Sequence, residues 1–104
     1  MALSKNNPTI QKSWKSLEKI YEQENDLKIV DYLKNEPTRV DRFSISLNNI
    51  YLDFSKNRIS EKALNYLIDL CNETDLKKNI NKYFNGEEIN ETEKRAVLHT
   101  ALRA

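Results

Sequence analysis

Near the N-terminus, apolar side chains recur every three or four residues, which is the spacing of one face of an α-helix. The apolar positions are Ile10, Trp14, Leu17 and Tyr21. Asn7 can accept a hydrogen bond from a free N–H group of the first turn, and Pro8 fits the first helical position, where its missing N–H would have no partner. The pattern therefore predicts an amphipathic helix over residues 8–24 that buries this stripe.

A second, shorter helix is expected next, with Leu27, Val30 and Leu33 on its inward face. It should end near Asn35, because Pro37 disfavours helical geometry at the residue before it. We interpret residues 1–42 as an N-terminal helical arm and residues 43–104 as a β-hairpin followed by further helices.

The period of the pattern changes from 3.6 to 2 at Phe43. The alternating apolar positions are Phe43, Ile45 and Leu47, followed by Ile50, Leu52 and Phe54. Asn48 and Asn49 lie between the two runs and tolerate left-handed backbone geometry, so they can form a tight turn. The pattern predicts an antiparallel β-hairpin. The polar stretch 53–58 that follows could contact a phosphate or another part of the fold, but we favour a capped and solvated turn.

Three helices are expected after the hairpin. The first is capped by Ser60, and the second ends at Gly86, which adopts left-handed geometry at no steric cost. The third begins at Asn90, which forms a capping-box pattern with Glu93, and continues to the end of the chain. Their expected buried positions are Leu64, Leu67, Ile68 and Cys71 in the first, Leu76, Ile80 and Phe84 in the second, and Val97, Leu98, Ala101 and Leu102 in the third.

Arg95, His99 and Arg103 are four residues apart and would share one face of this last helix. A row of cations with one titratable member could hold an anion or a carboxylate. We favour a structural or indirect supporting role, in which the row pairs with acids elsewhere in the fold. The sequence contains no catalytic constellation, since His99 has no nucleophile motif around it.

Composition narrows the possible partners. The chain has 104 residues, enough for one small domain or part of a larger one, and its 17 Lys and Arg nearly balance its 16 Asp and Glu. No broad electrostatic field therefore attracts nucleic acid or an anionic membrane. The single Gly also excludes glycine-rich phosphate loops.

Cysteine usage and hydropathy predict the cellular compartment. One Cys cannot form an intramolecular disulfide, and no cluster of Cys and His could hold a structural metal. No apolar run approaches the roughly 18 residues of a membrane span, and the polar N-terminus is unlike a signal peptide. We expect a cytoplasmic protein without a metal site.

Several stretches, in this order, resemble the glucose-6-phosphate isomerase (phosphoglucose isomerase) family. The first is Asn7-Pro8-Thr9 with Trp14 and Leu17, and the second, Leu52-Asp53-Phe54-Ser55-Lys56-Asn57-Arg58-Ile59, is similar to the family's LDYSKN segment. The most specific stretch comprises Phe84-Asn85-Gly86-Glu87, Ile89-Asn90, Thr92-Glu93, Arg95-Ala96-Val97-Leu98-His99 and Ala101-Leu102-Arg103. The chain departs from the family at Phe54, which replaces Tyr, at Glu88, which replaces Lys, and over residues 19–37, which match loosely.

The resemblance implies an aldose–ketose isomerase that interconverts glucose 6-phosphate and fructose 6-phosphate in glycolysis and gluconeogenesis, through an enediol and without a cofactor. It implies a homodimer of two-domain α/β (sugar isomerase) subunits. The family's catalytic and phosphate-binding residues lie beyond residue 104, so this chain would be a truncated N-terminal portion, mainly α with one β-hairpin, that serves as scaffold and is inactive alone. The alternative is a small stand-alone helical interaction module, which near-neutral charge and amphipathic helices also permit.

Overall fold

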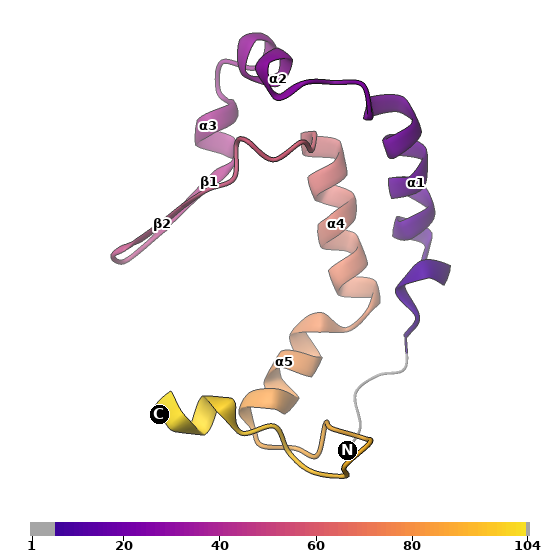
Figure 1. Cartoon of the computed structure of the whole chain (residues 1–104), viewed down its shortest axis with the longest axis vertical. Coiled ribbons are helices and arrows are strands. Elements are labelled where there is room, and N and C mark those ends of the chain that lie inside the picture. Colours follow the sequence, from indigo (N-terminus) through magenta and orange to yellow (C-terminus); the bar gives the residue numbers. More distant parts are fainter. Residues whose placement is uncertain (1–5, 104) are drawn as a thin grey trace.

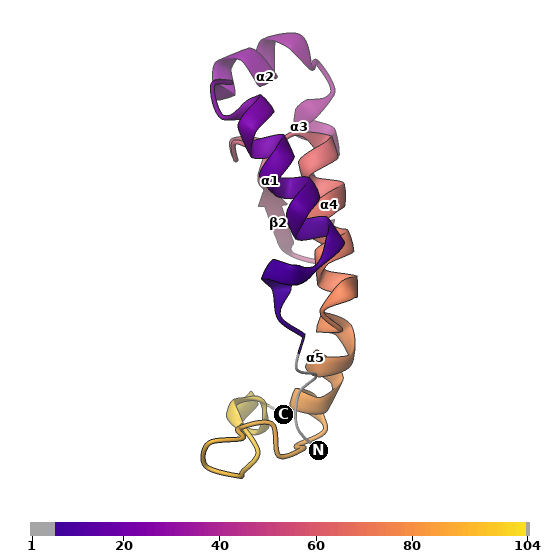
Figure 2. The same cartoon turned by 90° about the vertical axis from the view of Figure 1, so that its right-hand side faces the viewer.

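Two helices that run side by side in opposite directions form the body of the molecule (Figure 1, Figure 2). They are α1 (Lys12–Glu24) and α4 (Glu61–Glu73) in the computed structural model, which describes residues 6–103. Ser13 and Ile20 of α1 and Ala63 of α4 are buried. The carboxylate of Glu73, the last residue of α4, accepts a hydrogen bond from the Ser13 backbone N–H at 3.1 Å, so the end of α4 satisfies a free donor in the first turn of α1.

The predicted first helix is divided in two. Asn7 caps a 3₁₀ turn, η1 (Pro8–Ile10), by accepting a hydrogen bond from the Thr9 backbone N–H at 3.0 Å, and the extended residue Gln11 separates η1 from α1. The cap and the position of Pro8 are confirmed. The predicted burial of Ile10 and Tyr21 is wrong, because α4 packs on the line through Ser13 and Ile20.

The connection from α1 to the hairpin contains α2 (Ile29–Asn35) and the short α3 (Arg39–Arg42). The end of α2 at Asn35 is confirmed, and α3 was not predicted. Tyr32 is the buried residue of α2. The side chains predicted to face inward, Leu27, Val30 and Leu33, are exposed.

The predicted hairpin is confirmed. Strands β1 (Ser44–Leu47) and β2 (Ile50–Asp53) pair antiparallel, with Leu47 opposite Ile50 and Ile45 opposite Leu52. Asn48 at the turn has a φ of 51°, the left-handed geometry that an Asn tolerates. The ribbon extends away from the helices (Figure 1), and Phe43 is completely buried at its root.

After α4 the chain continues into α5 (Leu76–Phe84), and Gly86, with a φ of 72°, follows that helix as predicted. Ser60 caps α4, since its side chain accepts from the Ala63 N–H at 3.1 Å. The apolar stripes expected inside these helices are largely exposed instead, at Leu67, Ile68 and Cys71 of α4 and Leu76, Ile80 and Phe84 of α5. The chain is therefore mainly helical with one two-stranded hairpin, as predicted, but many of its apolar faces are uncovered.

Candidate functional site

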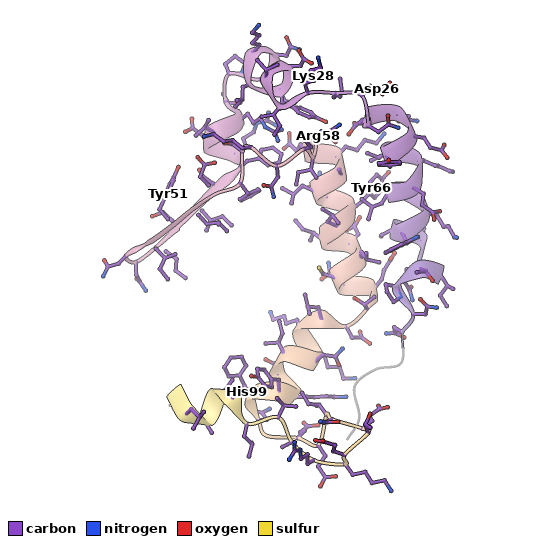
Figure 3. All side chains as sticks on the ribbon, viewed as in Figure 1. Asp26, Lys28, Tyr51, Arg58, Tyr66 and His99 are labelled. Atoms are coloured by element: carbon purple, nitrogen blue, oxygen red, sulfur yellow. The ribbon has the colours of Figure 1, made fainter. Side chains whose placement is uncertain are left out.

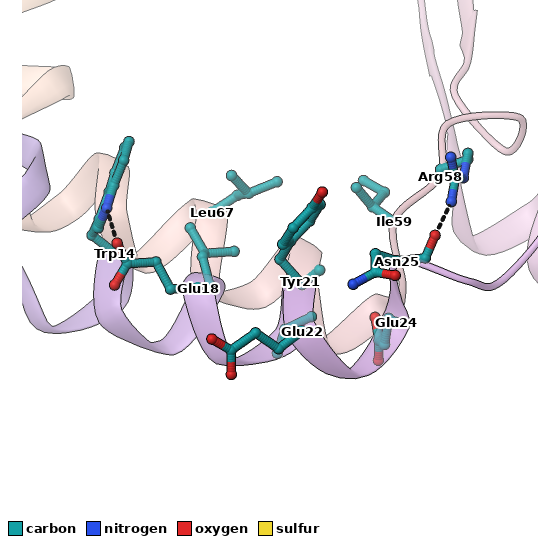
Figure 4. Close-up of a pocket in the computed structure, with 12 residues that line it drawn as sticks. Trp14, Glu18, Tyr21, Glu22, Glu24, Asn25, Arg58, Ile59 and Leu67 are labelled. Carbon is teal, nitrogen blue, oxygen red and sulfur yellow. Dashed lines mark hydrogen bonds between the residues drawn. The ribbon is translucent and has the colours of Figure 1, made fainter.

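A groove lies between α1 and α4, next to the segment that joins the hairpin to α4 (Figure 4). Its volume is about 870 Å³. The apolar lining comprises Trp14, Leu17, Ile20, Tyr21, Ile59, Ala63 and Leu67, and the polar lining comprises Glu18, Glu22, Glu24, Asn25 and Arg58. Three of the four side chains predicted to form the buried stripe of the first helix, those of Trp14, Leu17 and Tyr21, thus line an open groove.

The polar groups of this groove are engaged locally. The Trp14 indole N–H donates to Glu18 Oε1 at 3.1 Å. The Arg58 guanidinium donates to the backbone carbonyl of Asn25 and, at 3.3 Å, to that of Leu27, which ties Arg58 to the end of α1 and the loop after it. The lining contains neither a His nor a nucleophilic Ser or Cys. Its chemistry therefore suits contact with an apolar surface better than a reaction.

A second polar centre surrounds Arg39, which is completely buried. Its guanidinium donates to three backbone carbonyls, those of Ser55 at 2.7 Å, Asn57 at 2.8 Å and Ile59 at 2.9 Å. The charge is paired with Glu36 at 3.2 Å. The guanidinium also lies 4.5 Å from the ring centre of Tyr32 and 4.2 Å from that of Phe43, the geometry of cation–π contacts.

This arrangement explains the polar stretch at residues 53–58. Arg39 binds the backbone of this stretch. The stretch therefore contacts another part of the fold, which was one of the alternatives raised by the sequence. Arg39 itself was missed by sequence reasoning. The local pattern does not indicate its burial, because the three carbonyls that it binds lie 16, 18 and 20 residues further along the chain.

Two titratable groups in this region, Asp53 and Tyr32, have shifted pKa values. Hydrogen bonds from Ser55, from its side chain and then its backbone N–H, hold the pKa of the Asp53 carboxyl below its usual value. The backbone bond measures 2.9 Å. Burial, followed by the nearby Glu24 carboxylate, raises the pKa of the Tyr32 hydroxyl. Asp53 is therefore an anion at neutral pH and a weak base, and Tyr32 is a neutral hydroxyl.

Arg95, His99 and Arg103 do not lie on one continuous helix. Asn90 and Arg95 form an isolated antiparallel bridge, and only the 3₁₀ segment η2 (His99–Arg103) is helical in this region. Arg95 is 70% exposed and pairs with Glu93 at 2.6 Å, and His99 is exposed. The predicted helix from Asn90 to the end of the chain is wrong. A structural or supporting role for the three residues stays a prediction.

The predicted helix fails to form for one local reason and one tertiary reason. The Asn90–Glu93 contact predicted as a capping box forms, with the Glu93 N–H donating to Asn90 Oδ1 at 3.2 Å. Lys94 then adopts a φ of 52°, which ends any right-handed helix. Leu98 and Leu102 are exposed, and an amphipathic helix without a surface to pack on gains little stability.

Within residues 6–103 no group of three or more His, Cys, Asp or Glu side chains could hold a metal ion. In the same range no helix is long and apolar enough to cross a membrane. Arg58, beside the groove, and His99, near the C-terminus, lie in different parts of the molecule (Figure 3), so the structure does not bring these two side chains together at one site.

Comparison with known proteins identifies relatives of the chain. Residues 53–104 match the family model described as "Phosphoglucose isomerase". The chain is also 47% identical, over 98 residues, to the protein named glucose-6-phosphate isomerase from Christiangramia forsetii. That match covers 94% of this chain but only 18% of the relative, so the chain spans less than a fifth of the length of the curated relative.

Proposed function

Because this chain belongs to the phosphoglucose isomerase family, we propose that it is the N-terminal segment of a glucose-6-phosphate isomerase. The observation that carries the proposal is the 47% identity over 94% of the chain. The complete protein would interconvert glucose 6-phosphate and fructose 6-phosphate through an enediol, in glycolysis and gluconeogenesis.

The segment's own part in this enzyme is scaffolding. Proton transfer between two carbons needs a base whose pKa lies near the working pH. Asp53, the described carboxyl group with a clearly perturbed pKa, is shifted in the opposite direction. Arg39 and Arg58 are bound to backbone carbonyls, so they stabilise this chain's own loops. Catalytic and phosphate-binding groups would come from the rest of the polypeptide, and the 104 residues alone would be inactive.

Three further properties belong to the same proposal. The complete enzyme would be a homodimer, it would act in the cytoplasm, and it would need neither a metal ion nor an organic cofactor. These properties follow from the family resemblance, and the single free cysteine and balanced charge of this segment are compatible with them.

A chimeric enzyme tests the proposal. In the isomerase chimera, residues 1–104 replace the matched stretch of the Christiangramia forsetii relative. We expect fructose 6-phosphate to be converted to glucose 6-phosphate, measured by coupling the product to a dehydrogenase, with kcat/KM within tenfold of the relative. The isolated chain should show no turnover above background. A folded chimera without activity, or turnover by the isolated chain, would contradict the proposal.

A stand-alone interaction module is the second candidate, and the open apolar groove between α1 and α4 is the observation in its favour. The mass of the native gene product separates the two. A product of about 12 kDa in cells would support the module, and one several times larger would support the isomerase.

A further inference from the structure

The β-hairpin has one wholly apolar face. Residues directly opposite each other in an antiparallel pair project to the same side of the ribbon, as do residues two apart on one strand. Ile45 is opposite Leu52 and Leu47 is opposite Ile50. All four side chains therefore lie on one face, which we call the hairpin face.

The hairpin face continues the small core at the root of the ribbon. The register places Phe43 opposite Phe54 on the same side, and the Phe54 N–H donates to the Phe43 carbonyl at 2.9 Å. Their rings meet edge to face with centroids 5.4 Å apart. Phe43 is fully buried, whereas Ile45 and Leu52 are 57% and 54% exposed and Leu47 and Ile50 are 66% and 70% exposed. The exposed fraction of these side chains thus increases from the root of the ribbon to its tip.

The opposite face of the ribbon is mainly polar. It carries the pairs Ser44 with Asp53 and Ser46 with Tyr51. Tyr51 projects from the side of the ribbon that is turned away from α4 and α5 (Figure 3). The hairpin face is consequently turned to the side on which α5 lies. A strand pattern of this kind is expected where one face is solvated and the other is covered by a second layer.

Nothing within residues 6–103 provides such a layer. A two-stranded hairpin is at best marginally stable in water without packing on one face. Four adjacent large apolar side chains, each more than half exposed, form a patch typical of an interaction surface.

We propose that the hairpin face docks on the part of the longer isomerase polypeptide that lies outside these 104 residues. The inference rests on the proposed function. The length of the relative argues for this occupant: the matched stretch makes up 18% of it, so more than four fifths of that chain is available to supply the second layer. The alternatives, a second copy of the segment or no occupant, are outcomes of the test.

Thiol labelling of the isomerase chimera and of the isolated chain provides the test. Cys71 and any other native cysteines are replaced by Ser, and one new thiol is introduced by Leu47→Cys on the hairpin face. Ser46→Cys, the next residue along the strand, is the matched control on the polar face. We expect a maleimide to label Leu47→Cys at least tenfold more slowly in the native chimera than in the isolated chain. The control should label at similar rates in both, and unfolding in urea should remove the difference.

Each other result decides against the proposal. Rapid labelling of Leu47→Cys in the native chimera would mean that the face is uncovered. Protection in the isolated chain that rises with concentration, or protection in the chimera that disappears as its subunits dissociate, would make a second copy the occupant. Isomerase activity is measured on the same samples. An inactive chimera with a protected face would refute the proposed function alone, and an active chimera with an open face would refute the docking alone.

A second substitution keeps the proposal testable if the Leu47→Cys variant does not fold. Leu47→Thr introduces a residue that favours strands while removing apolar surface. We expect it to lower the melting temperature of the chimera by several degrees and that of the isolated chain by less than one degree. Equal shifts in the two proteins would contradict docking.

Discussion

The guanidinium of Arg39 donates to the carbonyl oxygen of Ser55 at 2.7 Å, across 16 residues of sequence. Through this bond and those to Asn57 and Ile59, one buried cation holds the segment that links the hairpin to α4. The segment includes Phe54 to Ile59, the larger part of the stretch that resembles the family's LDYSKN motif. Arg39 thus fixes the direction in which the hairpin leaves the helices.

Arg39→Ala should lower the free energy of unfolding by about 3 kcal/mol or more, because it leaves three carbonyls and Glu36 without their buried cation. Arg42→Ala, three residues along and partly exposed, is the control and should lower it by less than about 1 kcal/mol. Urea denaturation of both variants measures the difference. Similar losses in the two variants would show that the carbonyl contacts of Arg39 contribute little.

Ser60→Ala should destabilise α4 by about 1 kcal/mol, because the Ala63 N–H loses its acceptor at 3.1 Å. Ser60→Asp keeps an acceptor at the cap and should change stability by only a few tenths of a kcal/mol. Neither substitution should alter kcat in the folded isomerase chimera. A large fall in kcat at unchanged stability would mean that Ser60 takes part in the reaction.

Stability should also depend on the ionisation of Asp53. Hydrogen bonds from Ser55 lower its pKa in the folded chain, so the unfolded chain takes up the proton first as the pH falls. The stabilisation is present above the unfolded value, about 3.9, and is lost as the pH falls through the lower folded value. Urea midpoints measured from pH 6 to pH 2 should therefore drop more steeply for the native chain than for Asp53→Asn. Parallel curves would rule out this contribution.

Local signals in the sequence predicted local structure well. The caps at Asn7 and Ser60, the turn at Asn48 and the left-handed Gly86 each depend on one or two neighbouring residues, and the structure contains all four. The hairpin was equally predictable, because strict alternation of apolar and polar residues specifies both the strands and their faces.

The buried faces were predicted less well, because burial depends on what packs against a stripe. The pattern identified Ile68 on α4 and Ile80 on α5 as apolar, but no described element covers either side chain. Arg39 was missed for a related reason. Its partners at Glu36 and at Ser55 to Ile59 come together only when the chain folds, and a charged residue gives no periodic signal of burial.

Residues 90–95 form a bridge and a turn instead of the predicted helix, which changes the role expected for Arg95. Its side chain is 70% exposed and pairs with Glu93 in solvent, so Arg95→Ala should lower the free energy of unfolding by less than about 1 kcal/mol. A loss as large as that of Arg39→Ala in the same urea titration would instead support the sequence prediction that Arg95 pairs with acids elsewhere in the fold.

Lys94 provides a test whose sign separates the turn from the helix. In the turn the φ of Lys94 is 52°, a left-handed conformation that is strained for a residue with a Cβ. Lys94→Gly removes this strain but makes the unfolded chain more flexible. With both effects included, the substitution should raise the free energy of unfolding by roughly 0.5 to 1 kcal/mol. Inside a continuous helix over residues 90–104, the same substitution would instead lower stability by about 1 kcal/mol, because Gly is among the poorest helix formers.

Lys94→Ala is the matched control, since it keeps the Cβ and favours the helix. Urea denaturation of the isolated chain gives the stability of both variants. A Lys94→Gly variant that is more stable than Lys94→Ala would support the turn. The reverse order would show that the helix predicted from the Asn90 and Glu93 pattern forms in solution, and with it the shared face of Arg95, His99 and Arg103.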